Sequence, residues 1–162
     1  MQDTLSRPAL LGELRTVLQA DGASDAALQT ALEKLLQSFD CVVGTVHTLD
    51  PASGMLKLRA RKGIPDSILD KVRMIPIGKG MAGIAAERRQ AVQVCNLQTD
   101  ASGVAKPAAK DTKMEGSITA PMLVDGELRG TVGVAKPVPY EFTGEEERAL
   151  LAAGALIGSF VK

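Results

Sequence analysis

The sequence predicts an α+β domain in which helices flank antiparallel strand hairpins. Apolar residues recur at helical spacing near both ends of the chain, and two segments between them read as pairs of strands around turn-forming residues. A third observation is the run I-P-I-G-K-G-M-A-G at 75–83, where glycines join a strand end to a helix start. At 162 residues the chain fits one domain with a single core.

Two helices are expected first. The first covers 7–20, where leucines follow one another at helical spacing, and an Asp-Gly pair ends it. Ser24 or Asp25 begins the second helix, which covers 25–37.

The first hairpin follows, with strands over 41–49 and 55–62 joined by D-P-A-S-G. A register that sets Leu49 opposite Met55 places polar side chains on one face of the sheet and leaves the other face apolar. In this register three basic residues share the face of His47, namely Lys57, Arg59 and Arg61. The ordinary interpretation is that these basic residues form a solvated edge strand that discourages aggregation and that His47 is a half-exposed strand residue.

The remaining elements follow from local turn and cap signals. The segment 96–115 has no clear periodicity, which is typical of a lid or a disordered loop. Thr143-Gly-Glu-Glu146 is a capping-box pattern that opens the last helix. The predicted elements are a strand over 72–77, a helix over 80–88, strands over 91–95, 117–124 and 127–136, and a helix over 144–161.

Composition excludes several classes of protein. Nineteen basic residues balance nineteen acidic ones, and three Phe with one Tyr offer few stacking platforms, so nucleic-acid binding is not expected. Neither an apolar run long enough to span a membrane nor a signal-peptide pattern occurs, which predicts a cytoplasmic protein without membrane contact.

The residues that commonly hold metals or form disulfides are scarce. Cys41 and Cys95 lack C-x-x-C or Cys/His ligand spacing, and we expect both to be free, buried thiols. His47 is the single histidine, so a multi-histidine metal centre is excluded and no cofactor is predicted.

The order of these elements and their local motifs resemble the GAF domain family. The likeness rests on F-D-C-V-V-G-T-V-H-T-L-D at 39–50, the glycine run at 75–83, S-I-T-A-P-M-L-V-D-G-E-L-R-G-T-V-G-V at 117–134 and the F-T-G-E-E-E helix start at 142. It implies a GAF-like (profilin-like) three-layer α/β/α fold with a central antiparallel sheet of five or six strands. The chain then divides into an N-terminal helix and linker, 1–24, and a GAF domain, 25–162.

The family includes an enzyme of about this size, the free methionine-R-sulfoxide reductase, which needs reactive cysteines and pocket carboxylates. Where the resemblance places a cysteine in the glycine run this chain has Ala82, and 104–113 has no cysteine. Where it places acids on the last hairpin, the chain has Ser117, Gly133 and Ala135. We therefore expect no catalysis. Haem, bilin and cyclic-nucleotide versions fit poorly, because aromatic walls and the N-K-x-x-F-D pattern are missing.

Strand alternation predicts the lining of a ligand cavity on one face of the sheet. The helix over 80–88 and the 96–115 loop would roof it. The candidate ligand-binding residues are Val43, Thr45, His47, Met81, Ala82, Ile84, Ser117, Thr119, Thr131, Gly133 and Ala135.

The resulting hypothesis is a non-catalytic sensing or signalling domain for a small ligand. His47, the basic row and the start of the glycine-led helix favour an anion. Two alternatives stay open: a free methionine-R-sulfoxide reductase-like enzyme, and a homodimerisation module without a ligand. The module would pair through the terminal helices, where Gly154 and Gly158 allow close approach, and a sensor would pass its signal to a protein partner or a second copy.

Overall fold

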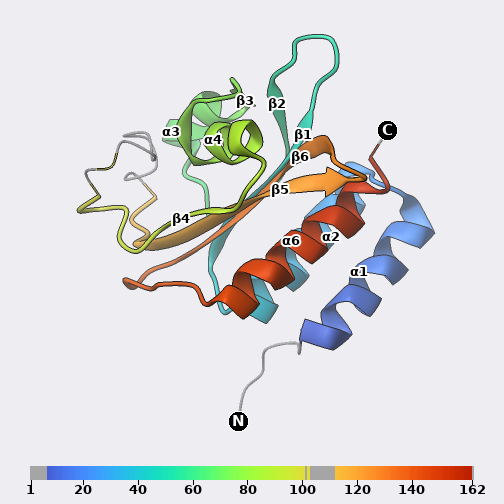
Figure 1. Ribbon diagram of the computed structural model, residues 1–162, viewed down its shortest axis with the longest axis horizontal. Helices are drawn as coiled ribbons and strands as arrows, with labels where there is room; N and C mark the ends of the chain where they lie inside the picture. Colours follow the sequence, from blue (N-terminus) through green and yellow to red (C-terminus); the bar gives the residue numbers. More distant parts are fainter. Residues whose placement is uncertain (1–6, 101, 103–111, 162) are drawn as a thin grey trace.

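The computed structural model describes residues 7–100, 102 and 112–161, and these form an antiparallel sheet between two helical layers (Figure 1). The strand order is β3-β2-β1-β6-β5-β4. This confirms the predicted α+β three-layer fold. The elements are α1 (Arg7–Asp21), α2 (Asp25–Phe39), β1 (Val43–Leu49), β2 (Leu56–Lys62), α3 (Asp66–Val72), β3 (Met74–Ile75), α4 (Gly80–Arg88), β4 (Val92–Val94), β5 (Gly116–Val124), β6 (Glu127–Lys136) and α6 (Gly144–Gly158).

The helices α2 and α6 cover one face of the sheet, α1 packs on them from outside, and α3 and α4 lie on the other face (Figure 1). Leucines at helical spacing on α2 are buried against the sheet, as their pattern predicts; Leu28, Leu32 and Leu35 are fully buried. Ser24 caps α2 by accepting a hydrogen bond from the Ala27 N–H at 3.1 Å. The predicted capping box at the start of α6 is present.

The glycines of α6 serve packing within the chain. A Cβ on Gly154 would come within 3.3 Å of Met122 and the Pro121 carbonyl, and one on Gly158 within 3.1 Å of Val124. Both glycines therefore let α6 approach its own sheet, and they do not mark a surface for a second copy.

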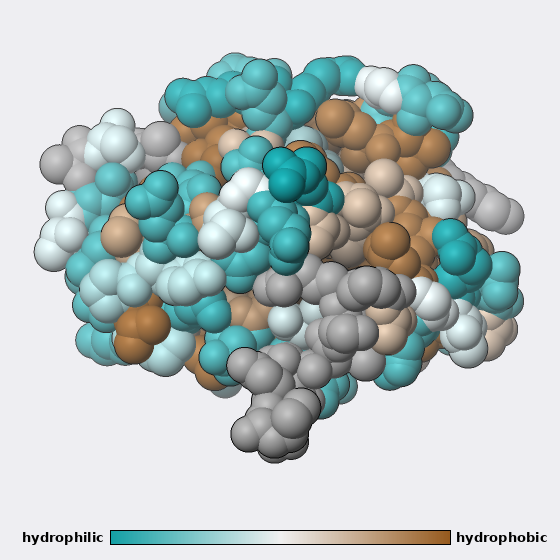
Figure 2. All heavy atoms as spheres, turned by 60° about the horizontal axis from the view of Figure 1, so that its bottom comes forward, coloured by the Kyte–Doolittle hydropathy of each residue, from teal (hydrophilic) through white to brown (hydrophobic). Residues whose placement is uncertain are grey.

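Some apolar surface of the terminal helices stays partly exposed. Leu11 and Val17 of α1 and Leu151 and Leu156 of α6 pack on the core without being buried. Figure 2 shows the molecule from beneath, and hydrophobic side chains are visible there between hydrophilic ones. None of the helices that the structure describes combines the length and the apolar character needed to cross a membrane.

The register of the first hairpin differs from the prediction by one residue. Leu49 pairs with Leu56, because the backbone N–H of Asp50 donates to the Met55 carbonyl at 2.8 Å and closes the turn one position earlier. The pairing then shifts between Val46 and His47, which leaves Arg59 as an extra residue on β2. This bulge directs the Arg59 side chain toward α2, away from the face of His47.

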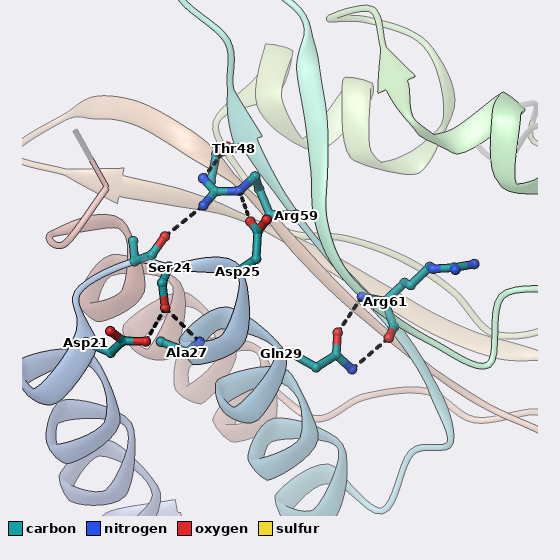
Figure 3. A network of polar contacts seen from close by, with 9 residues as sticks. Asp21, Ser24, Asp25, Ala27, Gln29, Thr48, Arg59 and Arg61 are labelled. Carbon is teal, nitrogen blue, oxygen red and sulfur yellow. Dashed lines mark hydrogen bonds and ion pairs between the residues drawn. The ribbon is translucent and has the colours of Figure 1, made fainter.

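Arg59 joins the sheet to the turn between α1 and α2 (Figure 3). Its Nε donates to Asp25 at 2.7 Å, and its Nη2 donates to the Ala23 carbonyl at 2.8 Å. A third, longer contact of 3.4 Å reaches the Thr48 hydroxyl of β1. One guanidinium thus holds the start of α2 against two strands.

Two side-chain amides bind backbone groups as a neighbouring strand would. Gln29 of α2 donates to the Arg61 carbonyl at 2.8 Å and accepts from its N–H at 3.2 Å (Figure 3). Gln93 of β4 holds Phe142 in the same two-point manner, at 3.2 and 2.8 Å. Beyond β4, the Tyr140 N–H donates to the Cys95 carbonyl at 3.0 Å.

The third predicted strand is much shorter than expected. Only Met74 and Ile75 pair with β2, because Val72 belongs to α3 and Pro76 cannot continue a strand ladder. The helix α3 precedes this strand, and its Ile68 is buried.

The glycine run packs tightly on α4, whose bounds match the prediction. A Cβ on Gly83 would lie 2.4 Å from the Pro76 carbonyl, so only glycine lets the loop rest on this helix. The Gly78 N–H donates to the Gly83 carbonyl at 2.8 Å, and Gly78 and Gly80 both have positive φ. These requirements explain why three glycines stand at 78, 80 and 83.

We expect Arg59→Ala to destabilise the fold and Arg61→Ala to leave it nearly unchanged. The first substitution removes charged hydrogen bonds to Asp25 and the Ala23 carbonyl, which should cost roughly 1–3 kcal/mol. Among the described residues, the Arg61 side chain makes one ion pair, at 3.6 Å, with the exposed Asp66, and such pairs contribute about 0–1 kcal/mol. Urea denaturation of both variants measures the difference; equal losses would contradict the role given to Arg59.

Candidate functional site

A cavity of about 150 Å³ lies between the sheet and the α3–α4 layer. Its floor consists of small side chains in two rows that cross three strands. Thr45, Gly133 and Thr119 form one row, because Gly133 pairs with both threonines. Val43, Ala135 and Ser117 form the other in the same way. Because these two rows carry only hydroxyls, small apolar groups and a glycine, they leave space beneath α4.

The walls of the cavity are mostly apolar. Ile64, Ile68, Val72 and Ile75 line it from α3 and its flanking residues, and Met81 lines it from α4. Val43 and Ala135 belong to a small buried cluster with Val94, Leu97 and Met114 on the same side. A cavity of about this volume with an apolar lining can hold a molecule as large as benzene.

The first turn of α4 borders the cavity together with two lysines. Lys79, Gly80, Met81 and Ala82 line it, as does Lys71 of α3. The first N–H groups of an α-helix have no partner within the helix, and the side chain of the N-cap residue, Lys79, does not cap them. Among the described lining residues no carboxylate occurs. The lining is therefore electrostatically suited to an anion.

His47 is a buried member of the cavity wall. Its side chain is only 1% exposed, and its Nε2 lies 2.8 Å from the Val72 carbonyl. A carbonyl oxygen can only accept, so Nε2 carries the hydrogen, and Nδ1 of the neutral ring is an acceptor. Burial lowers the pKa of His47, and the Val72 hydrogen bond opposes this only in part, which favours the neutral ring.

Two buried polar atoms at this place lack partners within the described part of the chain. They are Nδ1 of His47 and Oγ1 of Thr131, the residue directly opposite His47 on β6. Because His47 is almost fully buried, its interpretation as a half-exposed strand residue is wrong.

The structure brings together most of the residues that the sequence predicted for the cavity. Ile84 and Thr131 do not line it. Only the first turn of α4 borders the cavity, and Ile84 lies in the next turn. Thr131 comes two residues before Gly133 on β6, which separates their Cα atoms by about 6.6 Å. The predicted residues that do line it are Val43, Thr45, His47, Met81, Ala82, Ser117, Thr119, Gly133 and Ala135.

The basic row predicted beside His47 does not line the cavity. Arg59 points to α2 because of the bulge, and Lys57 pairs with Thr48 instead of His47. The positive groups that replace this row are Lys71 and Lys79, which the sequence reasoning missed. Lys79 stands inside the glycine run, so its position beside the helix start was a usable signal.

The predicted roof is described only in part. From the 96–115 loop, Leu97 and Thr112 line the cavity, whereas residues 101 and 103–111 lie outside the described residues. No group of three or more potential metal ligands occurs among the residues that the structure covers.

The cysteines differ from each other in exposure. Cys41 is buried, as expected, but Cys95 is exposed, so the prediction of two buried thiols is wrong for Cys95. Burial raises the pKa of the Cys41 thiol to about 12, although nearby Lys136 acts in the opposite direction. Neither cysteine is among the described residues that line the cavity.

Solved structures with the same fold include GAF domains and an enzyme. A GAF domain of a phosphoenolpyruvate-protein phosphotransferase from Coxiella burnetii is 18% identical, with a TM-score of 0.80 over 98% of this chain and 94% of that one. A putative GAF sensor protein from Burkholderia vietnamiensis is 22% identical, with a TM-score of 0.75 over 96% and 92% of the two chains. Free methionine-R-sulfoxide reductase from Neisseria meningitidis, in complex with its substrate, is 18% identical, with a TM-score of 0.76 over 98% and 95%.

At these identities the likeness shows the fold alone. No curated protein matches the sequence significantly. The family model for the GAF domain matches residues 23–162, which include the whole sheet and the cavity beneath α4. The chain therefore belongs to the GAF domain family.

Proposed function

We propose that this protein is a non-catalytic sensing domain that binds a small anion in the cavity between the sheet and α4. The observation that carries the proposal is the lining itself, which includes two surface-exposed lysines and the uncapped start of α4 but no described carboxylate. Apolar walls strengthen these charge interactions, because they exclude water from around the ligand. GAF domains are commonly small-molecule sensing modules, and the Burkholderia vietnamiensis protein is described as a putative sensor.

The proposal excludes sulfoxide reduction of the kind that the Neisseria meningitidis enzyme performs. That chemistry needs a reactive thiolate at the substrate. Cys41 is protonated at neutral pH because burial raises its pKa to about 12, and Cys95 is exposed outside the described lining. Ala82, which lines the cavity from the start of α4, carries no group that can react.

The output of such a sensor would pass through the terminal helices to a protein partner or a second copy. The partly exposed leucines of α1 and α6 favour this surface over others. Gly154 and Gly158 are not part of this helix surface, because both glycines face the chain's own sheet. Light scattering at several protein concentrations, with and without a bound anion, distinguishes a ligand-dependent dimer from a constant one.

Small anions should raise the thermal midpoint, and neutral ligands of similar size should not. A ligand at about 100 times its Kd stabilises the fold by about 2.7 kcal/mol, which corresponds to a shift of roughly 5–10 °C. A panel of inorganic oxyanions, short carboxylates and nucleotides, followed by differential scanning fluorimetry, measures the shift.

A matched pair of variants locates the binding. Ala82→Leu fills the cavity beside the start of α4, so the anion-dependent shift should disappear. Ala152→Leu makes the same change at an exposed position of α6 and should keep the shift. If both variants respond like the wild-type protein, the anion binds elsewhere and the proposal fails.

The native protein should expose one reactive thiol and show no turnover of methionine sulfoxide. A chromogenic disulfide reagent at neutral pH should titrate Cys95 alone, and unfolding in guanidinium should release the second thiol of Cys41. Cys95→Ser should abolish the native reaction. Methionine sulfoxide reduction that this substitution removes would overturn the non-catalytic assignment.

A further inference from the structure

We infer that the preferred ligand is a small amphiphilic acid, in which one carboxylate is attached to a compact apolar body of up to about six carbon atoms. An inorganic oxyanion or a nucleotide is then not the preferred ligand. The inference rests on the proposed function and narrows its ligand class. It comes from the different exposure of the charged and the apolar residues that line the cavity.

The positive charges of the lining belong to its solvent-exposed part. Lys71 and Lys79 are both exposed, and they are the cationic side chains of the lining that the structure describes. The other ionisable group there is His47, whose ring is buried, and burial favours its neutral form. The described lining therefore offers an anionic group a cation where the group also stays in contact with water.

The interior of the cavity has an apolar wall that continues from the sheet to the α3–α4 layer. Val43 of β1 and Ala135 of β6 line the cavity and belong to one buried cluster with Leu97. Ile64, which precedes α3, and Met81 of α4 also line the cavity and pack against this cluster. Removing apolar surface from water is favourable in proportion to its area, so an apolar ligand body gains affinity here.

Helix α3 carries both characters within one turn. Ile68 and Lys71 both line the cavity, and Ile68 is 2% exposed whereas Lys71 is an exposed residue. Residues three positions apart lie on the same side of a helix, about 4.5 Å apart along its axis. The buried apolar part of the cavity is therefore adjacent to a cation, at a separation that a carboxylate attached directly to a small carbon skeleton spans.

Inorganic oxyanions do not match this division. Sulfate and phosphate carry polar oxygen atoms on every side, so inside the cavity some of these oxygens would face Ile68 and Met81 without a hydrogen-bond donor. A monocarboxylate turns its charge to the lysines and its carbon atoms to the apolar wall. The cavity volume of about 150 Å³ limits the body to about the size of benzene, which excludes a nucleotide base with its sugar.

A series of unbranched acids tests the inference on the wild-type protein. Isothermal titration with acetate, propionate, butyrate, pentanoate and hexanoate should give a Kd that falls roughly 2- to 4-fold with each added methylene group. Octanoate and decanoate should gain nothing further, because the cavity is then full. Benzoate should bind about as tightly as hexanoate, whereas the neutral benzamide, sulfate and phosphate should bind more weakly.

A matched pair of variants locates the apolar body of the ligand. Val43→Thr replaces a methyl group of the lining by a hydroxyl, which should weaken hexanoate binding roughly 3- to 10-fold and acetate binding less. Val138→Thr makes the same exchange at a residue that is 52% exposed and is not among the described lining residues. This control should keep the wild-type gain per methylene, and the wild-type series gives an independent answer if Val43→Thr does not fold.

A second pair of variants locates the carboxylate. Lys71→Gln combined with Lys79→Gln should weaken every acid of the series by the same factor, roughly 3- to 30-fold, and leave the gain per methylene unchanged. Lys57→Gln combined with Lys62→Gln makes the same change in net charge at exposed residues that are not among the described lining residues. This control should bind the series like the wild-type protein.

The outcomes separate the inference from the proposed function. Equal affinities of acetate and hexanoate, or tighter binding of sulfate or phosphate than of every monocarboxylate, overturn the inference and leave anion binding in place. A gain per methylene that continues to decanoate also overturns it, because the ligand body then lies on a surface outside the cavity. Failure of the whole anion panel to bind overturns the proposed function as well.

Discussion

The molecule depends on one constraint, which is the alternation of side chains along the three central strands β1, β6 and β5. Val46, Val132 and Ile118 point to the terminal helices and are fully buried there. Apart from His47, their neighbours on the other face are small or hydroxyl-bearing. The same backbone thus supports a dense core on one side and a hollow on the other. The core and the cavity cannot be changed independently, because shifting any central strand by one residue would exchange the side chains of the two faces.

Much of this arrangement could be predicted from the sequence, since it depends on local patterns. The leucine spacing of α2, the glycines before α4 and the capping box of α6 each specify a local geometry with a physical cause. The alternation of the last hairpin likewise predicted that Ser117, Thr119 and Gly133 would share one face. These residues line the cavity because strand periodicity leaves them little choice.

The features that the sequence did not reveal depend on tertiary contacts. The bulge at Arg59 follows from the closure of the hairpin turn and from the Ala23 carbonyl and the Asp25 carboxylate, which bind the Arg59 guanidinium. The spacing of residues along the strand does not indicate these contacts. The burial of His47 depends on α3, whose last residue, Val72, offers its carbonyl to the ring. Cys95 is exposed because the strand before it ends at Val94, one residue earlier than expected.

The side-chain amide of Gln29 has a consequence for how this domain can assemble. An uncovered sheet margin recruits strands from other molecules and is a common route to aggregation. Gln29 occupies the outward backbone groups of Arg61, and the segment at Tyr140 occupies the Cys95 carbonyl at the opposite margin. Extension of the sheet by a partner's strand is therefore disfavoured at both of these points.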